Sequence, residues 1–239
     1  MHHEKKTVPA QTLVTLLIAV VAALMLFNQY QVWSMTAGGS VVKAAGGSSF
    51  TGSAGGKDLK SLDLSGIRST GHAVAAVFPV EEIKTIDDAI RVMIPTGTPD
   101  YGEALGVSFD DPVNSLNRLH RQVYPQIKAE VQQDASLWQR YLDLVTQPVG
   151  ISCEFCCGIG PVGVDGSGNL RCGCSHNPAI QALTLWLMKN TEYADGEILR
   201  EAMKWKALWF PKDMIGLGMT VAGGDTSALA NLPGMVGGC

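Results

Sequence analysis

A cluster of cysteines in the second half of the chain is the sequence feature with the clearest chemistry. Five of the six cysteines fall between Cys153 and Cys174, in the segment CEFCCGIGPVGVDGSGNLRCGC. Thiolates and imidazoles are ligands that zinc takes in proteins, with zinc–sulfur distances of about 2.3 Å. A C-x-x-C turn with a second ligand pair about fifteen residues later is typical of such a site. The candidate metal ligands are Cys153, Cys156, Cys157, Cys172, Cys174 and His176.

The spacing favours one set of four ligands. The C-x-x-C pair can face one ion from a single turn, and the C-x-C pair points to one side on extended backbone. We therefore expect a tetrahedral zinc site made by Cys153, Cys156, Cys172 and Cys174. Cys157 or His176 is the expected replacement for one of them. A closed site of this kind is structural and not catalytic. An iron–sulfur cluster or copper is the alternative occupant of the same ligands.

Two other uses of the cysteines fit the sequence. Six cysteines in an exported chain can pair completely as disulfides, in any of 15 arrangements, and would then staple an interaction domain. Alternatively, Cys172 and Cys174 form a redox-active or metal-transferring pair, with Cys156 or Cys157 as the resolving thiol. If four thiols bind a metal, Cys157 and Cys239 are left over and can form a disulfide with each other.

The segment between the two cysteine groups must bring them together. Residues 158–171 contain Asp-Gly and Ser-Gly dipeptides flanked by Val162, Val164 and Leu170, a pattern that predicts a β-hairpin. A hairpin returns its two ends to the same place. A helix is expected to start just after the second group, with Asn177 as its N-cap, and the positive end of its dipole favours nearby thiolates.

The remaining elements are predicted to be mainly helical. Apolar residues at helical spacing, Asp and Asn before Pro, and terminating prolines predict helices over 83–93, 111–123, 127–133, 137–145, 177–190 and 195–209. The last two, joined by a short connection, predict an antiparallel helical hairpin that stops at Pro211. The apolar run 72–80 predicts a short strand. The fold class is α+β and mainly α, with a Cys-rich hairpin knuckle.

The N-terminal region has the composition of a membrane anchor. Residues 13–27 (LVTLLIAVVAALMLF) carry no charge, and with residues 8–12 they are long enough to span roughly 30 Å of hydrocarbon. Lys5 and Lys6 precede this segment and favour an N-inside orientation. We expect a single-pass membrane protein with the bulk of the chain extracytoplasmic. If the segment is instead a cleaved signal, the chain is exported in soluble form.

Composition sets the expected organisation and partners. The formal charge is −4 and no Lys/Arg cluster is present, which argues against nucleic acid as a partner. The sequence contains no G-x-S-x-G, H-E-x-x-H or phosphate-loop motif, each of which would indicate an enzyme. The expected partners are the membrane, through the N-terminal helix, and a protein whose identity the sequence does not give. The expected parts are an anchor (1–35), a Gly/Ser-rich tether (36–70), a helical domain (71–215) with its knuckle (153–176), and a Gly-rich tail (216–239).

One segment carries a resemblance to a known family. Its matching residues are Ser175, Asn177, Asp195, Glu197, Ile198 and Pro211. Through these, 172–211 resembles the small thiol domain of the membrane-anchored cytochrome c maturation reductases. That family has a C-x-x-C redox pair where this chain has C-G-C, so the resemblance implies a helical hairpin that carries thiols. The segment is also similar to uncharacterised exported cysteine-rich proteins with a C-G-C turn.

Overall fold

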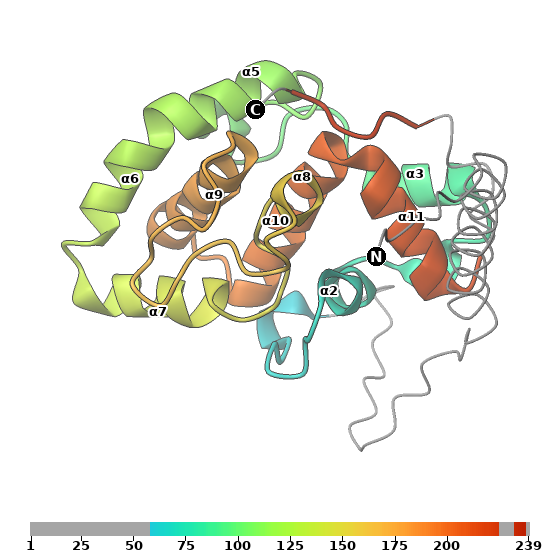
Figure 1. The fold of residues 1–239 in the computed structure, drawn as a ribbon, viewed down its shortest axis with the longest axis horizontal. Helices are drawn as coiled ribbons and strands as arrows, with labels where there is room; N and C mark the ends of the chain where they lie inside the picture. Colours follow the sequence, from blue (N-terminus) through green and yellow to red (C-terminus); the bar gives the residue numbers. More distant parts are fainter. Residues whose placement is uncertain (1–57, 225–231, 238–239) are drawn as a thin grey trace, which may run out of the picture. The chain divides into compact units, whose positions relative to one another are not determined.

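The computed structural model describes residues 58–224 and 232–237. They belong to the second of the two units into which the chain divides, Phe50–Cys239. These residues are mainly helical, which confirms the mainly α part of the predicted α+β class (Figure 1). The expected anchor and most of the expected tether lie outside the described residues. Among the helices that are described, none combines the length and apolar character needed to cross a membrane.

The described helices are short in the first part of the chain, and the longest three follow one another at its end. The elements are η1 (Leu59–Ser61), α2 (Thr70–Val77), η2 (Val80–Glu82), α3 (Ile86–Met93), α4 (Gly102–Leu105), α5 (Pro112–Arg118), η3 (Leu119–Val123), α6 (Tyr124–Val131), α7 (Ala135–Val145), α8 (Glu154–Cys157), α9 (His176–Asn190), α10 (Asp195–Trp209) and α11 (Pro211–Ala222). Of these, η1 and η2 are 3₁₀ turns and η3 is a π-helical stretch.

Helix α9 lies at the centre of the packing. Twelve of its fifteen residues are buried, so it is covered on all sides and not on one face only. It contacts η3, α6 and α7 as well as α10, and Figure 1 shows α9 and α10 side by side. Helix α10 in turn contacts α2 and α11, and α11 contacts α3. The large buried side chains of this core include Trp205, Trp209, Tyr141 and Phe210.

Most of the predicted helices are present, with ends shifted by a few residues. Asp111 caps α5 as expected, because its carboxylate accepts a hydrogen bond from the Asn114 amide. Pro125 lies in the first turn of α6, and the residues before it widen into the π-helical turn of η3. Proline lacks an N–H and clashes with the preceding turn, which accounts for this irregularity. The helical hairpin is confirmed as α9 and α10.

Two predictions for the flanking regions were wrong or incomplete. The predicted strand over 72–80 is instead helix α2, whose N-cap Ser69 accepts a hydrogen bond from the His72 amide. Alanine-rich apolar runs of this length fit a buried helix as well as a strand, and alanine favours the helix. Helix α11 was missed, since it extends into the glycine-rich stretch expected as tail from 216. Gly218 allows α11 to pack closely against α3, because a Cβ at this position would collide with Met93 of α3.

The predicted β-hairpin over 158–171 is not supported. Within the described residues, this segment takes part in two isolated bridges, Ile151 with Val162 and Val164 with Leu170, and in no named strand. Its turn is held by Asp165, whose carboxylate accepts hydrogen bonds from the backbone amides of Ser167 and Asn169. The segment therefore returns toward its start as a loop and not as a ladder of paired strands.

A buried ion pair ties α10 to the cysteine-bearing segment. Lys206 has no solvent exposure, and its ammonium donates hydrogen bonds to the Gly150 carbonyl and the Glu154 carboxylate, each at 2.8 Å. It also lies 4.9 Å from the ring centroid of Phe155. Burial lowers the pKa of Lys206, and the Glu154 charge opposes that shift. The pair therefore fixes α8 against α10 at the position where the cysteines begin.

Replacing Lys206 tests this role. Lys206→Met leaves the Glu154 carboxylate and the Gly150 carbonyl without their cation, so we expect a loss of about 3–5 kcal/mol in the free energy of unfolding. Urea unfolding of the purified chain measures it. Lys212→Met is the matched control, because Lys212 is exposed and should change stability by no more than about 0.5 kcal/mol. Equal effects of the two substitutions would refute the buried pair as an anchor.

Candidate metal centre

Two short stretches of backbone present the cysteines. The first is the one-turn helix α8, in which Cys153 is the N-cap residue and Gly158, with φ of +64°, is the C-cap. The second is the C-G-C turn that leads directly into α9. Glycine takes the left-handed conformation at Gly158 without steric cost, which lets the chain leave the helix abruptly. The loop 158–171 then returns the chain to the same place.

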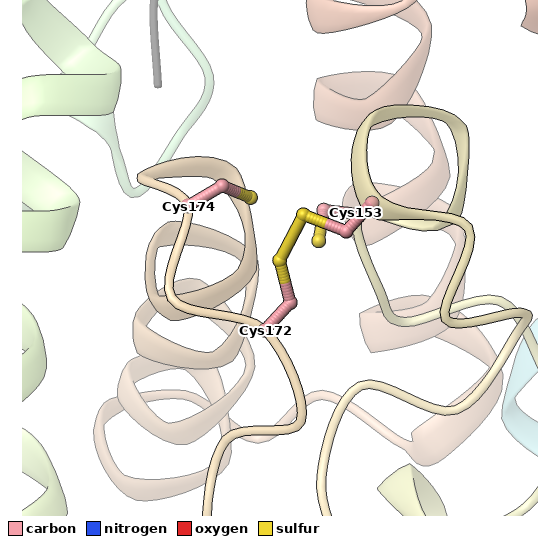
Figure 2. A group of neighbouring side chains, drawn as sticks. Cys153, Cys172 and Cys174 are labelled. Atoms are coloured by element: carbon pink, nitrogen blue, oxygen red, sulfur yellow. A yellow bond between two sulfur atoms is a disulfide. The ribbon is translucent and has the colours of Figure 1, made fainter.

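Four sulfur atoms converge there. The Sγ atoms of Cys153, Cys157, Cys172 and Cys174 all lie within 4.8 Å of one another. A tetrahedral zinc–thiolate site places its sulfurs about 3.8 Å apart, so even the longest separation in this group exceeds that spacing by only about 1 Å. Figure 2 shows three members of the group, Cys153, Cys172 and Cys174, approaching from two separate segments. The cysteine cluster can therefore hold a metal ion.

Two of these sulfurs are joined to each other. Cys157 and Cys172 form a disulfide, 15 residues apart in sequence, whereas Cys153 and Cys174 are buried thiols. The conformation described here is thus the oxidised form of the cluster. Two-electron reduction of this one bond would present four thiols to a single ion. The alternative bridge expected from Cys157 to Cys239 is not formed, since Cys157 is bonded to Cys172, and Cys239 lies outside the described residues.

The structure brings together a different set of four from the first choice of the sequence. Cys157, the expected replacement, takes the place of Cys156 beside the other three cysteines. Cys156 lies instead with Cys174 and His176 in a second group, whose ligand atoms are also within 4.8 Å of one another. Successive residues of a helical turn point about 100° apart, so the adjacent cysteines of α8 enter different groups, which have only Cys174 in common.

The two buried thiols are unequal. The pKa of Cys174 is lowered, chiefly by a hydrogen bond from the Cys153 thiol, and also by the first amides of α9. The same hydrogen bond, with burial, raises the pKa of Cys153. The pair therefore holds its proton on Cys153 and its charge on Cys174. A thiolate at a helix N-terminus is the form of cysteine that binds metals and attacks disulfides.

Buried amides of α9 hold the cysteine-bearing loop in position. Asn177 donates to the Gly163 carbonyl at 2.8 Å and to the Cys172 carbonyl at 3.3 Å. One turn later, Gln181 donates to the Ile151 carbonyl at 2.9 Å. Asn177 was expected as the N-cap of this helix, but the N-cap residue is Ser175. The Asn177 side chain instead donates its hydrogen bonds to the loop.

His176 is held rigidly at the edge of the cluster. It is 1% exposed, its Nε2 donates to the Val236 carbonyl at 2.9 Å, and its ring packs on Phe210 with centroids 4.8 Å apart. Because a carbonyl only accepts, Nε2 carries a proton, and in the neutral ring Nδ1 then holds the lone pair. Nδ1 has no hydrogen-bond partner among the described residues.

The chain was compared with known proteins at three levels. No family model, no curated protein and no solved structure matches it.

Gly163 offers a test of how tightly the loop is held. A Cβ at this position would lie 2.5 Å from Asn177 Oδ1, 2.6 Å from Gln181 Nε2 and 2.7 Å from the Ile151 carbonyl oxygen. We expect Gly163→Ala to lower the free energy of unfolding by about 1–3 kcal/mol in a urea titration, because these buried groups must move apart. Gly166→Ala, with nothing within 4 Å of its Cβ, is the control and should stay within about 0.5 kcal/mol. A neutral Gly163→Ala would show that the loop is free to shift.

Proposed function

We propose that the protein is a membrane-anchored, extracytoplasmic zinc-binding protein. Its ligands are the thiolates of Cys153, Cys157, Cys172 and Cys174, available together once the disulfide is reduced. The observation that carries this proposal is the approach of all four sulfurs to within 4.8 Å. Four thiolates in a compact group suit zinc better than magnesium, calcium or manganese, which take oxygen ligands.

The expected role of the ion is structural, in the assembly of a complex and not in catalysis. Four protein ligands fill the coordination sphere of zinc and leave no open position for substrate. The ligands come from α8 on one side and from the start of α9 on the other, so the ion would join two separate parts of the core. The apolar segment 13–27 supports the membrane attachment, and the surface presented beyond the membrane would bind a protein partner.

Zinc titration of the reduced full-length chain tests the proposal. In detergent, without oxygen and with a non-thiol reductant, we expect one zinc per chain by competition with a chromophoric chelator. Cys153→Ser removes a ligand and should weaken binding by at least about 100-fold, since even changes outside the ligand shell cost 10–100-fold. Cys156→Ser is the matched control and should leave affinity within a few-fold, because Cys156 is outside the group of four. Reduced protein that takes up no zinc would exclude this function.

A second function is favoured by the disulfide itself. The Cys174 thiolate lies within 4.8 Å of both Cys157 Sγ and Cys172 Sγ. Attack by this thiolate on either sulfur forms a new disulfide and releases the other cysteine as a thiolate, with no change in total oxidation state. The resemblance of 172–211 to thiol reductase domains agrees with such exchange. On this hypothesis the protein passes disulfides, or a metal, to a partner.

Disulfide mapping distinguishes the two functions. If exchange operates, incubation in a glutathione redox buffer, acid quenching and mass spectrometry will find Cys174 paired with Cys157 or Cys172 in part of the protein. Cys174→Ser should leave only the Cys157–Cys172 bond, and Cys156→Ser should behave as the parent chain. Finding the Cys157–Cys172 bond alone in all three proteins would argue against exchange.

A further inference from the structure

The oxidised cluster still contains three possible metal ligands that lie close together. The disulfide removes Cys157 and Cys172 from the four-thiolate group, leaving two sulfurs, which is too few for a closed site. The second group is untouched by the bond. Its members are Cys156, Cys174 and His176, with one ligand atom from each within 4.8 Å of the others. Cys174 belongs to both groups.

His176 has the surroundings of a histidine prepared for a metal. Metal-ligating histidines donate their other ring N–H to a carbonyl or carboxylate, which fixes the tautomer and the ring orientation. Here Nε2 donates to the Val236 carbonyl, and Val236 is itself anchored because its amide donates to the Trp209 carbonyl at 2.8 Å. The remaining nitrogen, Nδ1, is buried without a hydrogen-bond partner among the described residues. Leaving a buried acceptor unsatisfied costs free energy unless it binds something.

We propose that Cys156, Cys174 and His176 form a second metal site, which holds a zinc or copper(I) ion while Cys157 and Cys172 are oxidised. This inference rests on the proposed metal-binding function and deepens it. Because the two sites share Cys174, the chain holds one ion at a time. Oxidation then moves the ion from four thiolates to two thiolates and an imidazole.

The proposed move of the ion accompanies a two-electron oxidation of Cys157 and Cys172. The thiolates of Cys157 and Cys172 lose two electrons as their S–S bond forms, and a small disulfide oxidant such as oxidised glutathione gains those electrons as its own S–S bond breaks to give two thiolates. On a zinc ion, three protein ligands leave one of the four positions open, as in metal sites that exchange ligands. Cys156 is partly exposed, so a partner can reach the ion held at this second site. The oxidised state is therefore the state that releases or transfers the ion.

Cobalt(II) is a suitable probe, because the intensity of its sulfur-to-metal charge-transfer absorption reports the number of thiolate ligands. The full-length chain in detergent is titrated with Co²⁺ in two states, fully reduced and with the Cys157–Cys172 bond verified by mass spectrometry. We expect one Co²⁺ per chain in each state, with charge transfer in the oxidised state reduced to about half. That ratio follows from two thiolates in place of four.

Paired variants separate the two sites. His176→Gln should weaken Co²⁺ binding at least tenfold in the oxidised state and leave the reduced state within a few-fold, which also shows that the variant is folded. Cys153→Ser should do the reverse. Cys156→Ser, at a more exposed position, should reproduce the effect of His176→Gln.

Each result has one interpretation. Oxidised protein that binds no Co²⁺, while reduced protein binds it, overturns the second site and leaves the proposed function standing. Oxidised-state binding unaffected by His176→Gln also overturns it. Two Co²⁺ per reduced chain would show both sites filled together and overturn the exclusive use of Cys174. Reduced protein that binds no Co²⁺ removes the proposed function itself.

Discussion

Two buried amide side chains on α9 impose the constraint on which the cysteine cluster depends. Asn177 and Gln181 are inaccessible to water, so their amide N–H groups must donate to acceptors within the protein. The partners are carbonyls of the loop on both sides of the cluster, at Ile151, Gly163 and Cys172. A loop with almost no strand pairing is thereby held as firmly as a strand would be. The sulfurs converge because this loop cannot leave α9.

Positive groups near the cluster offset the negative charge of its thiolates. Four thiolates on a divalent ion carry a net charge of −2, which is costly to bury without nearby positive groups. The amide end of α9 faces Cys174, and the Lys206 ammonium is close enough to interact with Cys153. Lys206 is also paired with Glu154, so its charge is shared between a carboxylate and the cluster. The buried lysine thus holds the fold together and makes a group of thiolates less costly.

The helices whose positions are set by local sequence patterns were predicted from the sequence. Asp111 before Pro112, the prolines that end helices and the helical spacing of the last two helices were sufficient for most of the scaffold. The meeting of two cysteine groups also followed from the loop between them. Helix α2 and helix α11 were not predictable in this way, because packing, and not periodicity, makes an alanine-rich or glycine-containing run helical. The choice of Cys157 over Cys156 depends on the rotation of one helical turn, and the contact of Val236 with His176 joins residues 60 apart.

A disulfide and a metal ion would join the same two stretches of backbone. The Cys157–Cys172 bond closes a loop of 15 residues, which is worth about 3 kcal/mol by the loss of unfolded-chain entropy. A structural zinc bound to four thiolates contributes apparent free energies of about 10–16 kcal/mol in small domains. Either link holds α8 against the start of α9, so the fold does not need to change when the cluster changes oxidation state. What changes is the number of thiolates left to bind an ion. The position of Cys174 between the two ligand groups then decides where that ion is held.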